Sequence, residues 1–319
     1  MASILITGGA GFIGSHLTEA LVRDGREVVV LDNFDDFYLP DVKRRNLEPM
    51  KGRPGFSVVE GDIRDEAIVE KVFTTHPISV VVHLAARAGV RPSIEQPVLY
   101  ADVNVTGTSV LLEACRRHGI AKFVFGSSSS VYGNNSKLPF SEKDEVDRPI
   151  SPYAATKRAG ELLCATYHEL YRLNVFALRF FTVYGPRQRP EMAIHKFTRL
   201  IDRGLPVPRF GDGSTRRDYT YVSDIVNGVL RAIERVQGFE IINLGGSVTT
   251  RLDELIAQLE KHLNQKAIIE NEPAQPGDVV ATYADVEKAR RLLGFEPEIR
   301  PDEGIGRFVD WYRSLTVRA

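Results

Sequence analysis

Residues 4–14, which read ILITGGAGFIG, decide how this chain is expected to fold. The run begins with apolar and β-branched residues, as in a strand whose two faces are both buried. Gly8, Gly11 and Gly14 then follow at regular intervals. Glycines allow a tight turn that brings backbone N–H groups close to a pyrophosphate, and the helix opening here adds its positive end. Because the turn lies between a strand and a helix, the motif predicts a dinucleotide-binding unit.

The same alternation of strand and helix continues through the first 180 residues. Short apolar runs are typical of strands in a parallel sheet, and the stretches between them have helical periodicity. The expected strands are residues 4–7, 27–31, 56–60, 80–84, 122–127 and 175–180, and the expected helices are residues 13–24, 67–75, 98–118 and 152–173. This order indicates βαβ units wound on both faces of one sheet.

After residue 181 the chain becomes richer in proline and glycine. Shorter helices are expected at residues 223–236, 252–264, 285–293 and 301–315, and a strand at residues 239–244 that can rejoin the sheet. We therefore predict an α/β fold with a doubly wound parallel (Rossmann) sheet and a smaller C-terminal α/β domain that binds the substrate. The NAD-binding domain would take residues 1–181 and about 220–246, and the second domain residues 182–219 and 247–319. Residues 33–54 fit neither pattern, and so long a loop is usually functional.

Charge and cysteine content exclude several classes of protein. The formal net charge of the 319 residues is −1, so nothing favours a nucleic acid or a membrane surface as partner. Cys115 and Cys164 form no CxxC or Cys/His cluster, so no metal site is expected. No apolar run approaches the roughly 18 residues of a membrane span, and the N-terminus has no signal-peptide pattern. We expect a soluble, cytoplasmic protein.

Asp32 ends the second expected strand, about 20 residues after the glycine motif, as a dinucleotide fingerprint requires. A carboxylate there accepts hydrogen bonds from the adenosine ribose and repels a 2′-phosphate, which favours NAD over NADP. Asp62, after the third strand, is placed to hold the adenine edge. For both residues the alternative is a turn or helix cap.

Tyr153 and Lys157 form a YxxxK pair at the start of the expected helix 152–173. A spacing of four places both side chains on one face of the helix. A phenol ordinarily titrates at about pH 10, but a nearby ammonium favours the phenolate, which is a base. The alternative is a packed aromatic residue and a solvated lysine. The hydroxyl-rich run 126–133, GSSSSVYG, follows the fifth strand, and ligands bind at such strand ends.

Along nearly its whole length the chain resembles the extended short-chain dehydrogenase/reductase family. The segments that carry the resemblance are TGGAGFIGSH from residue 7, the Asp32-Asn33 pair, HLAARAGV from residue 83, DVNVTGT from residue 102, SSSSVYG from residue 127, YAATK from residue 153 and LRFFTVYGP from residue 178. The resemblance implies that Tyr153 is the catalytic base and that Lys157 lowers its pKa and holds the nicotinamide ribose. It also implies that Ser128, or else Ser130, bonds the reacting hydroxyl.

NAD is the cofactor that the resemblance implies. The residues expected at its site are Gly8, Gly11, Phe12, Ile13, Gly14, Asp32, Asn33, Asp62, Ile63, Leu84, Ala85, Ala86, Asn104, Ser127, Tyr153, Lys157 and Phe181.

Residues 128–130, all serine, separate the branches of this family. Sugar-nucleotide 4,6-dehydratases look like Thr-Asp-Glu there, and uronate decarboxylases resemble Thr-Ser-Glu. This chain has no carboxylate in the segment, which favours a simple 4-epimerase that oxidises the sugar transiently and reduces it again.

Residues 182–193, TVYGPRQRPEMA, resemble the corresponding segment of UDP-glucuronate 4-epimerases, as do DNFDDFY at 32–38 and QPGDV at 275–279. Arg189 is the candidate that grips the C6 carboxylate, with Thr182 on its other side, because a guanidinium fork suits a planar anion. This chain differs from many of those enzymes in having Arg187-Gln188 ahead of Arg189, so Arg187 is an alternative ligand of the carboxylate. The resemblance further implies that Arg217 contacts the UDP diphosphate and that Asp278 lies near the uridine ribose or the diphosphate end. Arg87, just past the fourth strand, is expected near the sugar.

Other functions stay open at this point. The first alternative is a 4-epimerase of UDP-glucose or UDP-N-acetylglucosamine. The second is a non-catalytic NAD-binding regulatory protein, which the Tyr153/Lys157 pair disfavours, and the third is a dehydrogenase that releases NADH. The family resemblance also implies a homodimer, paired through the helical patterns at 98–118 and 152–173.

Overall fold

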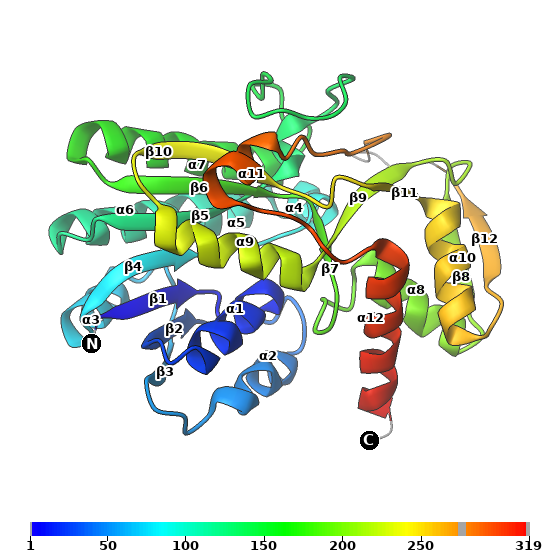
Figure 1. Ribbon diagram of the computed structural model, residues 1–319, viewed down its shortest axis with the longest axis horizontal. Coiled ribbons are helices and arrows are strands. Elements are labelled where there is room, and N and C mark those ends of the chain that lie inside the picture. The colour runs from blue at the N-terminus through cyan, green and yellow to red at the C-terminus, as the bar shows by residue number, and fades with distance from the viewer. Residues whose placement is uncertain (1, 274–278, 317–319) are drawn as a thin grey trace.

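The computed structural model describes residues 2–273 and 279–316. A seven-stranded parallel sheet forms its centre, in the order β10-β6-β5-β4-β1-β2-β3 (Figure 1). These strands are β1 (Ser3–Thr7), β2 (Val28–Asp32), β3 (Phe56–Glu60), β4 (Ile78–His83), β5 (Lys122–Ser128), β6 (Asn174–Phe180) and β10 (Phe239–Leu244). The winding direction reverses between β1 and β4, which confirms the predicted doubly wound fold.

Helices cover both faces of this sheet. Ile4 and Ile6 of β1 pack in one hydrophobic cluster, whereas Leu5 packs in a second cluster on the opposite face. Helices α1 (Phe12–Arg23) and α9 (Val222–Arg235) belong to the first, and α3 (Glu66–Thr75), α6 (Gly107–Arg117) and α7 (Pro152–Tyr171) to the second. Since successive side chains point to opposite faces, a strand covered on both sides is apolar throughout, which is why the sequence reveals it.

The C-terminal part adds two small sheets and a group of helices. One sheet joins β7 (Thr182–Tyr184), β9 (Arg216–Tyr221) and β11 (Thr249–Arg251), and the other joins β8 (Pro206–Phe210) and β12 (Ile268–Glu272). The helices are α8 (Ala193–Asp202), α10 (Leu252–Leu263), α11 (Glu287–Leu293) and α12 (Pro301–Thr316). Helices α8, α10 and α12 gather beside β8 and β12 at one end of the molecule (Figure 1). The exact division into two domains stays a prediction.

Two expected segments differ from the structure. Residues 33–54 are not a bare loop, because they contain α2 (Pro40–Leu47) and a short 3-10 helix (Glu48–Met50). The inward face of α2 buries Lys43 and Asn46 beside Leu47, so it lacks an apolar stripe. The helix expected at 98–118 is present and runs without a break through α5 (Pro97–Ala101), a π-helical turn (Asp102–Thr106) and α6, but the unexpected α4 (Val90–Glu95) precedes it. Within the described residues no helix is long and apolar enough to cross a membrane.

Candidate active site

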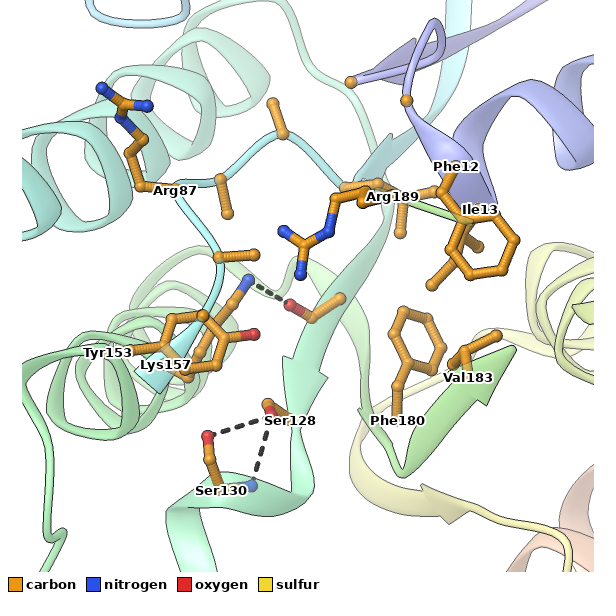
Figure 2. A pocket seen from close by; sticks show the side chains of 18 of the residues that line it. Phe12, Ile13, Arg87, Ser128, Ser130, Tyr153, Lys157, Phe180, Val183 and Arg189 are labelled. Carbon is orange, nitrogen blue, oxygen red and sulfur yellow. Dashed lines mark hydrogen bonds between the residues drawn. The ribbon is translucent and has the colours of Figure 1, made fainter. Parts of the chain in front are cut away.

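A cavity of about 470 Å³ opens at the carboxyl ends of the parallel strands. Its lining comes from the turns after β1, β2, β3, β4, β5 and β6, together with α7 and the loop that follows β7. In a doubly wound sheet, ligands bind at this edge, beside the reversal between β1 and β4. Figure 2 shows Tyr153, Lys157, Ser128 and Ser130 on one wall and Arg189 across from them, with Phe12 and Ile13 farther along.

The turn after β1 cannot be built with larger residues. Gly8 has a φ of +71°, and a Cβ there would lie 2.7 Å from the backbone nitrogen of Ala85, just after β4. A Cβ on Gly14 would lie 2.1 Å from the carbonyl oxygen of Gly8. No side chain caps the first turn of α1, which begins at the cavity with Gly11 and Phe12. The backbone of the glycine turn and the uncapped start of α1 therefore fit the pyrophosphate of a dinucleotide.

Asp32 lies at the end of β2 and lines the same cavity. Its carboxylate accepts hydrogen bonds from the backbone N–H groups of Ala10 (3.0 Å) and Phe34 (2.9 Å). Burial raises the pKa of Asp32, while these two N–H groups and Lys43 act in the opposite direction. The carboxylate thus ties the glycine turn to the segment after β2 and has oxygen lone pairs left for ribose hydroxyls.

Asn33 and Asp62 continue this wall beyond Asp32. The amide of Asn33 donates to Oδ2 of Asp62 at 3.0 Å, and Arg64 donates to both oxygens of the same carboxylate. These bonds from Arg64 lower the pKa of Asp62 to about 2, so it is charged at neutral pH. Asp62 is therefore an acceptor at the cavity edge, where the adenine position is expected.

Asn104 is the one residue expected at the cofactor site that does not line the cavity. Its side chain is buried, and its oxygen accepts from the backbone N–H of Arg87 at 2.8 Å. Its nitrogen donates to the carbonyl of Arg87 and to Oγ1 of Thr156, both at 3.0 Å. Asn104 thus joins the turn after β4 to helix α7, and it supports the site from behind.

Helix α7 presents Tyr153 and Lys157 at its first turns. Ser151 caps the helix by accepting from the N–H of Ala154 at 3.1 Å, and Pro152 occupies the first helical position. Lys157 Nζ lies 6.0 Å from the centroid of the Tyr153 ring and donates to the carbonyl of Gly126 at 2.6 Å. The spacing inferred from the sequence therefore brings the phenol and the ammonium to the same wall of the cavity.

Ser128 and Ser130 face this pair from the end of β5 (Figure 2). Ser128 Oγ accepts hydrogen bonds from the Ser130 hydroxyl at 2.9 Å and from the Ser130 backbone N–H at 3.2 Å. These two bonds orient the Ser128 hydroxyl. The Ser130 hydroxyl, in contrast, uses its own proton in the bond to Ser128. Ser128 is thus the better placed of the two serines to hold a substrate hydroxyl beside Tyr153.

The electrostatics of the phenol differ from the sequence interpretation. Burial raises the pKa of Tyr153, and the opposing influences are contact with Ser128 and the positive charge of Arg189. The ammonium of Lys157, from which that charge is expected, lies 6.0 Å from the ring centroid and donates to the carbonyl of Gly126. Burial also lowers the pKa of Lys157 itself to about 8, against the pull of Glu161. Arg189 is thus a further cation, beyond Lys157, that favours the phenolate.

A buried ion pair lies behind Lys157 and was missed by the sequence reasoning. Arg179 of β6 donates two hydrogen bonds to Glu161 of α7, at 2.8 and 2.9 Å, and both side chains are buried. Ser127, which lines the cavity, donates to the same carboxylate at 2.6 Å. The only sequence signal was a charged residue in an otherwise apolar strand and another on the inner face of a helix.

Arg189 points into the cavity from the loop after β7 (Figure 2). Its Nε lies 3.1 Å from a carboxylate oxygen of Glu191, and its guanidinium lies 5.5 Å from the ring centroid of Phe37. The guanidinium of Arg87 lies 5.4 Å from the same ring and donates to Asp35 at 2.8 Å. Phe37 and Asp35 belong to residues 33–54, the segment whose length alone predicts a functional role.

The other residues expected at the substrate site differ in whether they line the cavity. Thr182 and Arg217 line the cavity with Arg189, whereas Arg187 does not. Arg187 instead pairs with Glu19 of α1 at 2.5 Å, which makes Arg189 the arginine that reaches the cavity. Asp278 and Gln275 lie outside the described residues. Among the residues that the structure describes, no cluster of His, Cys, Asp and Glu could hold a metal ion.

Comparisons with known proteins agree with this geometry. Residues 5–308 match the family model described as GDP-mannose 4,6 dehydratase. The chain is 44% identical to a UDP-glucuronate 4-epimerase of Thermodesulfobacterium geofontis, over 98% of this chain and 96% of that protein. It is also similar to the crystal structure of a UDP-glucuronic acid 4-epimerase from Bacillus cereus in complex with UDP-glucuronic acid and NAD, with a TM-score of 0.92, 37% identity, and coverage of 98% of this chain and 99% of that one. A UDP-glucose 4-epimerase from Thermotoga maritima with UDP-glucose gives a TM-score of 0.91, 34% identity, and coverage of 98% and 99%.

The close approach of Gly8 to Ala85 predicts a specific effect on dinucleotide binding. Gly8→Ala places a Cβ where the turn after β4 already lies, so the phosphate-binding turn must move. We expect the Kd for NAD, measured by calorimetric titration, to rise about tenfold or more, which corresponds to about 1.4 kcal/mol or more.

Gly25→Ala is the matched control for that variant. Gly25 has a similar φ of +73°, but a Cβ added there would meet no atom within 4 Å, so only the backbone strain is shared. Equal NAD affinities for the two variants would show that the contact with Ala85 does not matter for binding.

Proposed function

This chain belongs to the family of the GDP-mannose 4,6-dehydratase model, and we propose that within it the chain is an NAD-dependent isomerase that inverts C4 of a UDP-sugar. The proposed reaction converts UDP-glucuronate to UDP-galacturonate through a transient 4-keto sugar. One observation carries the proposal: Tyr153 and Lys157 face Arg189 across a cavity that the dinucleotide turn also lines. An acid–base residue and a carboxylate ligand then meet beside the cofactor in one site.

The residues that would hold NAD come from the ends of β1, β2, β4, β5 and β6 and from helix α7. The glycine turn and the first turn of α1 would bind the pyrophosphate, Asp32 the adenosine ribose, and Lys157 the nicotinamide ribose. Leu84, Ala85, Ala86, Ser127 and Phe181 line the space between them. Bound NAD supplies the hydride acceptor that the reaction needs, and it ends each turnover in its starting state.

Tyr153 is the proposed acid–base residue. Its phenolate takes the proton of the 4-hydroxyl while Ser128 holds the same oxygen, so the C4–O bond gains carbonyl character as the C4 hydrogen leaves. The positive charge of Arg189 and the contact with Ser128 favour the phenolate. After the keto sugar presents its other face, the phenol of Tyr153 returns the proton to the 4-keto oxygen as the hydrogen comes back to C4, which forms the new 4-hydroxyl. Atoms and electrons balance over the cycle, so no external oxidant is required.

The lining of the cavity distinguishes this reaction from the one that names the family model. Residues 128–130 offer three hydroxyl groups and no carboxylate. Loss of water from C5 and C6 requires an additional acid and base, which these serines do not provide. Epimerisation needs only Tyr153 and an exchangeable hydride, and this supports an epimerase over a dehydratase.

Arg189 and Thr182 are the proposed ligands of the C6 carboxylate. The pair of Arg189 Nε with Glu191 leaves the two Nη nitrogens of the fork to meet a planar anion. Arg217 is the proposed ligand of the diphosphate, and Asp278 stays a prediction for the uridine end. Arg87 also lines the cavity and stays a proposed neighbour of the sugar, while its bond to Asp35 supports the segment after β2 that lines the same cavity.

Tyr153→Phe tests the assigned base. We expect kcat for epimerisation to fall by about 100-fold to 10,000-fold, because the variant retains the ring but cannot accept the hydroxyl proton. NAD affinity should stay within a factor of about two, since the phenol adds little to dinucleotide binding. Tyr167→Phe, on the same helix but bonded to Glu113, is the control and should keep normal turnover. Near-normal activity of Tyr153→Phe would refute the mechanism.

Substrate choice is tested by comparing UDP-glucuronate, UDP-glucose and UDP-N-acetylglucosamine as separate substrates. We expect the highest kcat/KM with UDP-glucuronate. Arg189→Gln should lower that value by about 100-fold or more, and lower the value for UDP-glucose less, because only the acid loses a charged partner. Arg203→Gln, an exposed position after α8, serves as the control. A wild-type preference for UDP-glucose would overturn the choice of substrate in favour of the alternative epimerase.

We further propose that the protein is a cytoplasmic homodimer. The two cysteines are buried and unpaired, as is usual in a reducing compartment. Helix α7 exposes Leu162 and Leu170, at 52% and 64% of their surface, and Val98 of α5 is 80% exposed. Apolar side chains gathered on one pair of packed helices favour association of two copies.

The dimer proposal predicts a change of mass in solution. Light scattering coupled to size exclusion at micromolar concentration should give twice the chain mass for the wild type. The double variant Leu162→Glu, Leu170→Glu should give a monomer, because charges would be buried in the interface. Leu205→Glu, at a position 44% exposed elsewhere on the molecule, should stay dimeric. A monomeric wild type would contradict the proposal.

A further inference from the structure

The loop that carries Arg189 is fastened to the helix that begins at the dinucleotide site. This loop, residues 185–192, joins β7 to α8. His16 of α1 donates from Nε2 to the carbonyl of Pro186 at 2.8 Å. Arg187 Nη2 lies 2.5 Å from Oε2 of Glu19, one turn farther along the same helix. Arg187 Nη1 also donates to Ser15 Oγ at the longer distance of 3.5 Å, so three contacts hold the start of the loop against α1.

The backbone of Arg187 adopts an unusual conformation. Its φ is +65°, a left-handed value that a long side chain rarely takes. The side chain of Arg187 then reaches α1, while that of Arg189 reaches the cavity (Figure 2). Such a conformation persists only where neighbouring contacts stabilise it, and the Arg187 side chain makes an ion pair with Glu19 and a longer hydrogen bond to Ser15 Oγ at 3.5 Å.

Buried hydrogen bonds fix the middle of the loop to the other side. Gln188 is 2% exposed; its Nε2 donates to the carbonyl of Val183 at 3.1 Å, and its Oε1 accepts from the N–H of His195 at 3.2 Å. The His195 ring Nδ1 donates to the carbonyl of Gln188 at 2.6 Å, and the ring packs on Phe308 and Trp311 of α12. Arg187 and Gln188 thus bind the loop to opposite parts of the molecule.

The protonation of His16, at the contact with α1, is affected by burial and by the charge of Arg187. Burial, and secondly the charge of Arg187, lower the pKa of His16 to about 4, so the ring is neutral at physiological pH and donates through Nε2. The guanidinium of Arg187 is 16% exposed and its partner Glu19 is 42% exposed, so the pair is half-shielded from water. Removing Arg187 leaves the His16 bond as the remaining side-chain contact described between α1 and this loop, whereas removing Glu19 leaves in addition the long hydrogen bond from Arg187 to Ser15.

We propose that Arg187 is a positioning residue for substrate selection: its ion pair with Glu19 fixes the Arg189 fork relative to the helix that begins at the dinucleotide site. The inference rests on the proposed function, in which Arg189 binds the C6 carboxylate. With α1 as the common support, the distance between the carboxylate ligand and the hydride acceptor is set by the protein before substrate arrives. A sugar without a carboxylate gains less from this arrangement, because Arg189 then acts only on the phenol of Tyr153.

The test compares kcat/KM for UDP-glucuronate and UDP-glucose in the holoenzyme. Arg187→Gly removes the ion pair and keeps the backbone conformation, since glycine takes a positive φ without strain. Glu19→Gln removes the same pair from the other side. For each variant we expect about a tenfold loss with UDP-glucuronate and less than about a twofold change with UDP-glucose, and the double variant should lose no more than either single one. The charge-swapped protein, Glu19→Arg with Arg187→Glu, should recover most of the selectivity.

Each other outcome overturns the inference. Equal losses on both substrates, or a double variant whose losses add, would show that Arg187 and Glu19 support the fold separately. Unchanged selectivity in every variant would show that the ion pair has no role in substrate selection. The proposed function would still stand in that case if the wild type prefers UDP-glucuronate. A wild type that prefers UDP-glucose rejects the proposed function and this inference with it. Thermal melting and NAD titration of each variant show whether a loss comes from unfolding or from cofactor release.

Discussion

The contact between the turn after β1 and the turn after β4 is the constraint on which the rest of the site depends. It exists because Gly8 takes a positive φ and has no side chain, so its backbone can lie against Ala85. The contact spans the point where the winding of the sheet reverses, and it fixes where α1 begins. Tyr153 and Arg189 then take their places relative to that point, the first through β5 and α7, the second through the loop fastened to α1.

Buried charge is the second organising feature, and it is arranged in layers. Lys157 faces the cavity, Glu161 and Arg179 lie behind it, and Arg189 lies across from it. Burial favours the neutral form of Lys157 and the protonated form of Tyr153, so each depends on neighbours for its charged form. Glu161 acts on the lysine, and Arg189 acts on the phenol. In the proposed mechanism Arg189 therefore has two effects, because the cation that binds the C6 carboxylate also favours the phenolate that takes the proton of the 4-hydroxyl.

Much of this arrangement was predictable from the sequence, and the limits are physical. Strands buried on both faces are apolar throughout, so the sheet could be predicted. The glycine spacing and the YxxxK pair each have structural alternatives, and the main wall of the cavity could be predicted because they occur with the hydroxyl-rich run 126–133 in the order of a known family. Helix α2 could not, because its buried face holds Lys43 and Asn46 in place of an apolar stripe. The link from Asn104 to Arg87, and the pair of Glu161 with Arg179, join residues far apart in the chain. The choice between Arg187 and Arg189 required the positive φ that turns one of them toward α1.

The central claim is that the hydrogen on C4 leaves as a hydride, is held by the enzyme and returns to the same carbon. UDP-glucuronate deuterated at C4 tests this most directly, with the product analysed by mass spectrometry and NMR after incubation in ordinary water. The account predicts that the product carries the deuterium at C4, that none appears in the solvent, and that turnover slows with the heavy isotope. Loss of the label to water, or entry of solvent deuterium at C4 in the converse experiment, would contradict it.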